Sequence, residues 1–186
     1  MPGVDPFERL IGALEEAGLW RGLSSDRASE IVRGLVSGLD MTWPSGGAWR
    51  ADGEDLAEGE VEEWLAGMVG SLGDCGVSLV VETRSGPYDE RLDSYRVAVN
   101  GKGLDLYFVD PAERSLPLAL DPWMDCTVVP AAEVNRLLGE VGSERRVGVF
   151  WPGGNDGFSV LGPEGVLREA AAGIVAVDGA SAFVVP

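Results

Sequence analysis

The chain has 186 residues, of which 45% are hydrophobic, and its 14 basic and 31 acidic side chains give a formal net charge of −17 at pH 7. Such a charge argues against nucleic acid or an anionic membrane surface as a partner, because both repel a polyanion. The chain has no histidine, which excludes Ser-His-Asp and Cys-His catalytic sites, imidazole general bases and zinc sites that contain histidine.

The apolar content predicts a single folded domain over residues 1–186 with one well-buried core. No apolar run approaches the roughly 18 residues that cross a bilayer, and residues 1–10 lack the basic start and apolar run of a secretion signal. We therefore expect a soluble, cytoplasmic protein. Cys75 and Cys126 lack CxxC spacing, so we predict buried free thiols, with a disulfide or a reactive thiol as the alternative.

Two amphipathic helices are predicted near the N-terminus. The first has Asp5 as its N-cap and Pro6 at the first helical position. The second has Ser24 or Ser25 as its cap and carries an apolar stripe over residues 28–39. Together they predict a helical hairpin.

The stretch that follows, residues 43–55, has no periodicity and places Pro44 and several glycines around Trp43 and Trp49. This composition predicts an exposed loop. Tryptophan is enriched at binding hot spots, so both rings are candidates for partner contact; the alternative is that they fold back onto the core. A third amphipathic helix is predicted over residues 56–72.

From residue 76 the hydrophobic period changes to two, which indicates strands. The strands are predicted over residues 76–83, 93–100 and 103–110, and a tight turn at residues 100–103 joins the last two. An antiparallel meander follows from this pattern, and Pro117 indicates a further edge strand over residues 115–120. The expected core face of the meander consists of Val77, Leu79, Val81, Tyr95, Val97, Val99, Leu104, Leu106 and Phe108.

The C-terminal part is predicted to alternate helices with strand pairs. A helix opens at Pro130 and closes at Gly142, and a hairpin over residues 145–162 follows it. A short helix over residues 163–173 and a final strand pair around Asp178 complete the chain.

Helices lead and strands dominate the middle and the end, without regular βαβ alternation. The predicted fold class is therefore α+β, with N-terminal helices packed on a mainly antiparallel β-sheet and a C-terminal helix and hairpin portion. The helical part covers about residues 5–72 and the β-rich part about residues 76–186 of one domain.

The negative charge is concentrated in one segment. Residues 51–83 contain nine acidic and no basic side chains, and seven of the acids lie within residues 52–63. Carboxylates in the first turns of a helix are favoured by its dipole, but their number exceeds what capping requires. A calcium loop of the EF-hand type that starts at Asp52 would need glycine at its sixth position, where Ala57 stands.

Three interpretations of this acidic segment remain open, namely a solvated helix start, a docking surface for a basic protein and a metal site. We predict the docking surface, with no metal, no cofactor and no catalytic residue. The predicted partner-binding residues are Trp43, Trp49, Asp52, Glu54, Asp55, Glu58, Glu60, Glu62 and Glu63.

Other candidate sites carry weaker signals. The glycine-rich loop at residues 153–157 is followed by a predicted strand and not by a helix, so we expect a hairpin connection and no phosphate cradle. Asp121 and Asp125 could form a carboxylate pair, but the sequence does not determine their separation. Lys102 is the only lysine, and Arg96 stands where a P-loop would need glycine.

The run SLVVETRSGPYDERLDSYRVAVNGKGLDLYF resembles a segment of bacterial immunity proteins that are paired with polymorphic toxins, particularly the deaminase-type toxins of actinobacteria. The resemblance covers about residues 77–109 and carries over no catalytic residue. It implies a small cytoplasmic binder without a catalytic apparatus, which meets a basic, nucleic-acid-acting toxin through an acidic face. The predicted function is therefore that of an immunity protein; the alternatives are an acidic adaptor or scaffold protein and an enzyme that uses only carboxylates or arginine.

Overall fold

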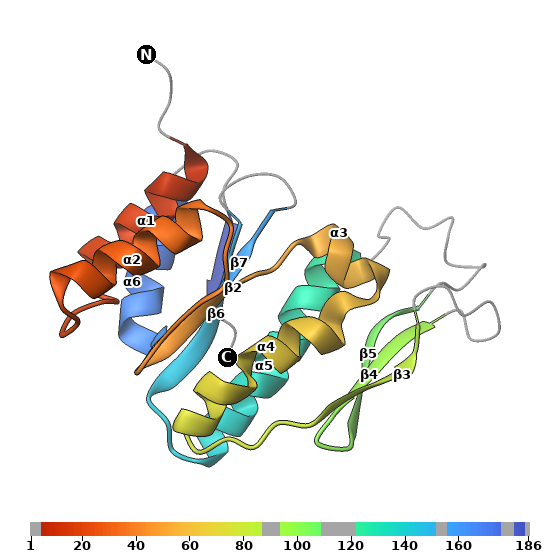
Figure 1. Cartoon of the computed structure of the whole chain (residues 1–186). Coiled ribbons are helices and arrows are strands. Elements are labelled where there is room, and N and C mark those ends of the chain that lie inside the picture. The colour runs from red at the N-terminus through yellow and green to blue at the C-terminus, as the bar shows by residue number, and fades with distance from the viewer. Residues whose placement is uncertain (1–4, 87–93, 109–121, 152–155, 176–180, 185–186) are drawn as a thin grey trace.

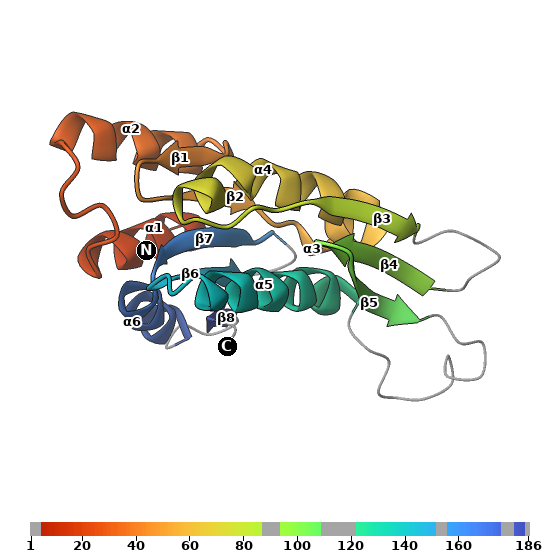
Figure 2. The same ribbon diagram turned by 90° about the horizontal axis from the view of Figure 1, so that it is seen from below.

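The computed structural model describes residues 5–86, 94–108, 122–151, 156–175 and 181–184. Its secondary structure forms four layers, which Figure 1 shows from one side and Figure 2 from below. A five-stranded sheet lies between two layers of helices, and a three-stranded sheet covers the outer side of one helical layer. The α+β class and the packing of helices on antiparallel sheets are thus confirmed.

The central sheet has the order β1-β2-β7-β6-β8, and all neighbouring strands are antiparallel. Its strands come from both ends of the chain, since two precede residue 51 and three follow residue 144. The strand bounds are Met41–Trp43 for β1, Gly46–Arg50 for β2, Phe158–Pro163 for β7, Arg145–Trp151 for β6 and Ser181–Val184 for β8.

Helices cover both faces of this sheet. On one face lie α1 (Pro6–Glu16), α2 (Ser25–Val36) and α6 (Glu164–Val175), and on the other lie α4 (Val61–Asp74) and α5 (Pro122–Glu140). Because both faces are covered, successive residues of a strand are buried on opposite faces of the sheet. In β7, Val160 packs in the core under α1, α2 and α6, while its neighbour Leu161 packs in the core under α4 and α5.

The predicted meander is confirmed as the three-stranded sheet, but its first strand begins at Val81 and not at residue 76. It consists of β3 (Val81–Ser85), β4 (Ser94–Val99) and β5 (Lys102–Phe108), paired antiparallel in that order. Asn100 and Gly101 form the turn between β4 and β5 with φ angles of 49° and 79°, which suit asparagine and glycine. Tyr95, Val97 and Val99 face the core as expected.

The two N-terminal helices are also confirmed, with the predicted caps. The Asp5 carboxylate accepts a hydrogen bond from the Phe7 amide at 2.7 Å, and the Ser24 hydroxyl accepts one from the Arg27 amide at 3.3 Å. None of the helices described is long and apolar enough to cross a membrane.

The expectation of an exposed loop over residues 43–55 is wrong, because β1 and β2 form a hairpin there that joins the central sheet. The glycines of this segment allow close packing and not exposure. A Cβ atom on Gly46 would lie 2.1 Å from the Leu161 carbonyl oxygen, and one on Gly47 would lie 2.6 Å from the Trp49 ring. The absence of a side chain lets β2 approach its neighbours.

Two C-terminal predictions also need correction. Helix α5 starts at Pro122 and continues through Pro130, because buried residues on both sides of the proline hold it against the core. Where the first strand of the final pair is expected, the chain up to Val175 belongs to α6. The last strand, β8, pairs with β6. The predicted edge strand at residues 115–120 lies outside the described residues.

Candidate functional site

The acidic segment does not form one continuous helix. It contains the short helix α3 (Gly53–Asp55), a wide π-helical turn over Leu56–Glu60, and the start of α4. The helical conformation is interrupted at Gly59, whose φ of 127° and ψ of 1° lie outside the helical region. A residue with a side chain rarely adopts this φ, so glycine permits the break. The carboxylates before and after Gly59 therefore do not follow one helical spacing.

Two tyrosines of the meander bond the backbone on either side of the break. The Tyr95 hydroxyl accepts a hydrogen bond from the Val61 amide at 3.3 Å, and the Tyr107 hydroxyl donates to the Ala57 carbonyl at 3.1 Å. Both side chains are buried, and their rings meet edge to face at 5.9 Å. The three-stranded sheet thus holds the acidic turn in place.

A cavity of about 230 Å³ opens beside this turn, and carboxylates dominate its lining. Five acids and one arginine border the cavity, which gives the lining a formal charge of −4. Leu56 and Trp64 add apolar surface to it. The charged residues are Asp40, Arg50, Asp52, Asp55, Glu60 and Glu63.

Arg50 organises one side of this acidic cavity. Its guanidinium lies 2.9 Å from the Asp52 carboxylate and 2.8 Å from the Asp156 carboxylate, and its backbone amide donates to Asp40 at 2.9 Å. The bond to Asp156 is the main reason why the pKa of Arg50 is raised. Asp52 also caps α3, because it accepts from the Glu54 amide at 3.0 Å.

Glu60 is in an unfavourable environment for its charge. Its pKa is raised first by desolvation and then by the carboxylates of Asp55, Glu63 and Asp52, while Arg50 acts in the opposite direction. Like charges and partial burial both disfavour an ionised carboxyl group. A cation that entered this cavity would relieve that repulsion, so the arrangement suits an arginine or lysine side chain.

The remaining acids of the segment lie elsewhere. Glu62 accepts a hydrogen bond from the Thr83 amide at 2.7 Å, and its pKa is lowered first by a hydrogen bond from the Thr83 side chain and then by this backbone bond. Glu54 and Glu58 are exposed and do not line the cavity. Of the seven predicted carboxylates, the cavity therefore brings together Asp52, Asp55, Glu60 and Glu63.

The two predicted tryptophans are core residues. Trp43 and Trp49 are 4% and 2% exposed, and the Trp49 indole donates to the Gly67 carbonyl at 3.0 Å. Trp43 packs edge to face with Trp20 at 6.4 Å. In the structure both rings fold back onto the core, which is the alternative interpretation. Neither ring is therefore available as a surface anchor.

The sequence did not indicate Asp40, Arg50 or Asp156 as members of the site. Arg50 and Asp156 are 106 positions apart, and they meet because β2 pairs with β7 and the Ala51 amide donates to the Gly157 carbonyl. The loop predicted as a plain hairpin connection joins β6 to β7 and contributes Asp156; its residues 152–155 lie outside the described part.

The other candidate residues do not form a second chemical site in the described ranges. Cys75 and Cys126 are both free thiols, and burial raises the pKa of Cys126 to about 12. Lys102 pairs with the buried Glu133. Asp125 lies on α5, whereas Asp121 is outside the described residues.

Within the described residues, no group of three or more cysteine, aspartate or glutamate side chains is placed to hold a metal ion. No protein-family model, no curated protein and no solved structure matches this chain.

Proposed function

We propose that this chain is an immunity protein that binds and neutralises a cognate bacterial toxin through its acidic cavity. One observation carries the proposal. Five carboxylates border the cavity with a single guanidinium among them, and the pKa of Glu60 is raised first by desolvation and then by its negative neighbours. The folded protein therefore maintains a local excess of negative charge that a basic partner would neutralise.

The cavity suits one basic side chain of the partner. An arginine or lysine from the toxin would enter beside Glu60 and replace repulsion between carboxylates with ion pairs. Asp55 and Glu63 would contact the same cation, because they border the cavity together with Glu60. Arg50 would stay bound to Asp52 and Asp156 and keep the site's geometry.

Two acids of the segment that do not line the cavity have a different role in the proposal. Glu54 and Glu58 are exposed on the same acidic segment. Exposed charges at the rim of an interface mainly accelerate encounter, and salt screens their effect. A basic, nucleic-acid-acting toxin would be drawn to this face, and its active site would be occluded. The proposal includes a cytoplasmic location for the complex.

The position of the meander supports the proposal. The segment that resembles toxin-immunity proteins contains Tyr95 and Tyr107, the two residues whose hydroxyls bond the turn that carries Glu60. The segment that carries the resemblance therefore supports the turn that borders the acidic cavity.

The experiment expresses the product of the neighbouring gene under a repressible promoter and measures growth with and without this chain. Wild-type chain should restore growth. The triple variant Asp55→Asn, Glu60→Gln, Glu63→Gln should protect less, and its association with the purified neighbour product should slow by at least about tenfold at low salt. Added salt should reduce the difference between the wild-type chain and the variant.

A control variant removes the same charge elsewhere. Glu8→Gln, Glu144→Gln and Glu169→Gln change exposed residues on α1, before β6 and on α6. This control should bind and protect like the wild-type chain. Equal weakening by both triple variants would show that total charge and not the cavity matters. Binding without protection would indicate an adaptor, and the absence of both would refute the proposal.

A further inference from the structure

Trp123 differs from the other tryptophans of the chain because it lies on the surface. It is 44% exposed, whereas the other five are at most 9% exposed. Met124, the next residue, is 40% exposed, so two large apolar side chains are adjacent at the start of α5. Tryptophan is among the residues most enriched at binding hot spots, which makes this pair a candidate for partner contact.

The acidic segment packs directly against Trp123. A Cβ atom on Gly53, the first residue of α3, would lie only 2.9 Å from the Trp123 Cβ. Figure 1 accordingly shows α3 beside one end of α5. Asp52 and Glu54 flank Gly53 in the chain, and Asp52 borders the acidic cavity. The exposed tryptophan therefore lies next to the segment that carries the proposed docking site.

The described helices around Trp123 bring acidic and not basic side chains near it. On α5 the nearest charged residue is Asp125, and the first basic residue, Arg136, comes about 20 Å further along the helix. Residues 51–83, which include α3, have no basic side chain. A cation that approaches Trp123 therefore meets carboxylates from both helices.

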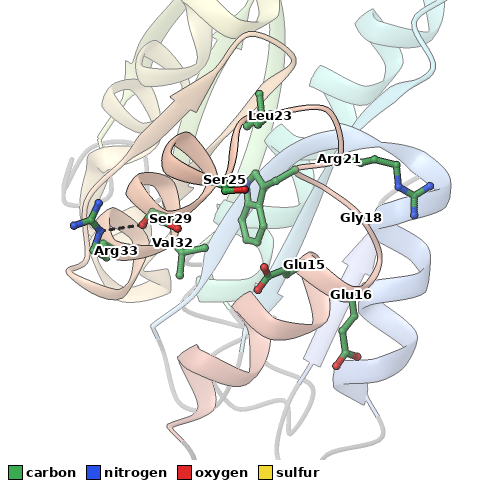
Figure 3. A pocket seen from close by; sticks show the side chains of 11 residues that line it. Glu15, Glu16, Gly18, Arg21, Leu23, Ser25, Ser29, Val32 and Arg33 are labelled. Carbon is green, nitrogen blue, oxygen red and sulfur yellow. Dashed lines mark hydrogen bonds between the residues drawn. The ribbon is translucent and has the colours of Figure 1, made fainter.

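A cavity of about 610 Å³ between α1 and α2 has a different charge (Figure 3). Its charged lining residues are Glu15, Glu16, Arg21 and Arg33, so the lining is formally neutral. It lies across the central sheet from the acidic cavity, because α1 and α2 cover one face and α4 covers the other. A basic partner is not drawn to this cavity, and its glutamates provide matched control positions.

We propose, resting on the proposed function for the partner's identity as a toxin, that Trp123 and Met124 form the apolar anchor of the docking face and bind an arginine of a basic partner. The guanidinium lies against the face of the Trp123 indole, which attracts a cation, and donates to the Glu54 carboxylate. The aliphatic part of the arginine packs against Met124. Arginine is preferred to lysine, because its planar group stacks on an aromatic ring. The anchor role predicted for Trp43 and Trp49 thus falls to Trp123.

The test titrates acetylated and amidated tetra-arginine and tetra-lysine peptides into the ¹⁵N-labelled full chain at low salt and follows the indole N–H resonances by NMR. Loss of a resonance in Trp123→Leu and in Trp64→Phe assigns Trp123 and the tryptophan that borders the acidic cavity. Tetra-arginine should shift the Trp123 resonance saturably and bind about two- to fivefold more tightly than tetra-lysine. The two peptides carry equal charge, so electrostatic attraction alone predicts equal binding.

Two variants and a control separate stacking from general attraction. Trp123→Leu keeps an apolar side chain at an exposed position, so it should fold normally and lose the preference for tetra-arginine. Glu54→Gln should weaken binding of tetra-arginine about two- to threefold. The control Glu16→Gln also removes one exposed charge but should bind like the wild-type chain.

Four results would overturn the proposal. They are no saturable shift of the Trp123 resonance, a shift of the Trp64 resonance alone, an arginine preference that is absent from the wild-type chain or survives in Trp123→Leu, and equal binding by Glu54→Gln and Glu16→Gln.

The product of the neighbouring gene separates this proposal from the proposed function. If it binds the wild-type chain, Trp123→Leu should raise its dissociation rate at least about fivefold, and this effect should persist in salt that removes the effect of the cavity variant. An unchanged dissociation rate would overturn the anchor role. If the product does not bind the wild-type chain, the toxin partner is refuted, and the peptide titration decides whether Trp123 binds arginine.

Discussion

Removing the hydroxyl groups of Tyr95 and Tyr107 should destabilise the turn that carries the acidic cavity. Each phenylalanine substitution deletes one hydrogen bond to the backbone beside Gly59 and keeps the ring. Both tyrosines are buried, so water does not readily replace the lost partner. A buried backbone group that loses its partner costs about 1–2 kcal/mol, and we expect that loss of unfolding free energy for each single variant.

Urea unfolding measures this loss directly. For a slope of about 2 kcal/mol per molar urea, the midpoint of each single variant should fall by about 0.5–1 M. The double variant should lose less than the sum, because both hydroxyls support one turn and the first substitution already frees it. The two losses therefore should not add.

The matched control is Ser37→Ala. Its hydroxyl also donates to a backbone carbonyl, that of Arg33 at 2.8 Å, but Ser37 is exposed at the end of α2. The control should change the midpoint little, because water replaces the lost bond. Midpoints for Tyr95→Phe and Tyr107→Phe that equal the wild-type value would refute the role of these hydroxyls at the break.

Four further predictions concern stability. Gly59→Ala should cost about 1–3 kcal/mol in urea unfolding, because alanine is strained at a φ of 127°. Glu60→Gln should raise the midpoint at pH 7, since the raised pKa of Glu60 means that its charge opposes folding, and the gain should shrink as the pH falls below that pKa. Glu62→Gln should lower the urea midpoint at pH 7. This loss should disappear as the pH falls below 4.5, through the lowered pKa of Glu62. Identical pH profiles for Glu60→Gln and Glu62→Gln would contradict both expectations. Asn135→Ala should cost about 2–4 kcal/mol, because its side-chain amide bonds both the N–H and the C=O of Val147 in the buried part of β6, and an unchanged unfolding midpoint would contradict that.

The sequence correctly predicted those elements that are specified by residues close together in the chain. The caps at Asp5 and Ser24 and the alternation in the meander lie within a few residues of the structure they specify. The turn at Asn100 and Gly101 needs positive φ angles that these two residue types tolerate. These features could be read from the sequence because neighbours along the chain determine them.

The hairpin of β1 and β2 could not be read in the same way. Its glycines are typical of a loop, but β2 is placed by β7, more than 100 residues later, and the Ser159 hydroxyl donates to the Trp49 carbonyl at 3.3 Å. The environment of Trp49 is therefore set by distant residues. A tryptophan beside glycines and acids carries no local sign of whether its ring is exposed or buried.

By itself the sequence determined where the negative charge is concentrated and excluded sites that need histidine. It also determined that the helix over the acidic segment has an apolar side, because spacing and charge are properties of neighbouring residues. Only the tertiary structure decided that the helix breaks at Gly59 and that Tyr95 and Tyr107 bond the break. It also divided the carboxylates between the cavity and the rest of the surface, because contacts between distant strands set the distances among charged groups.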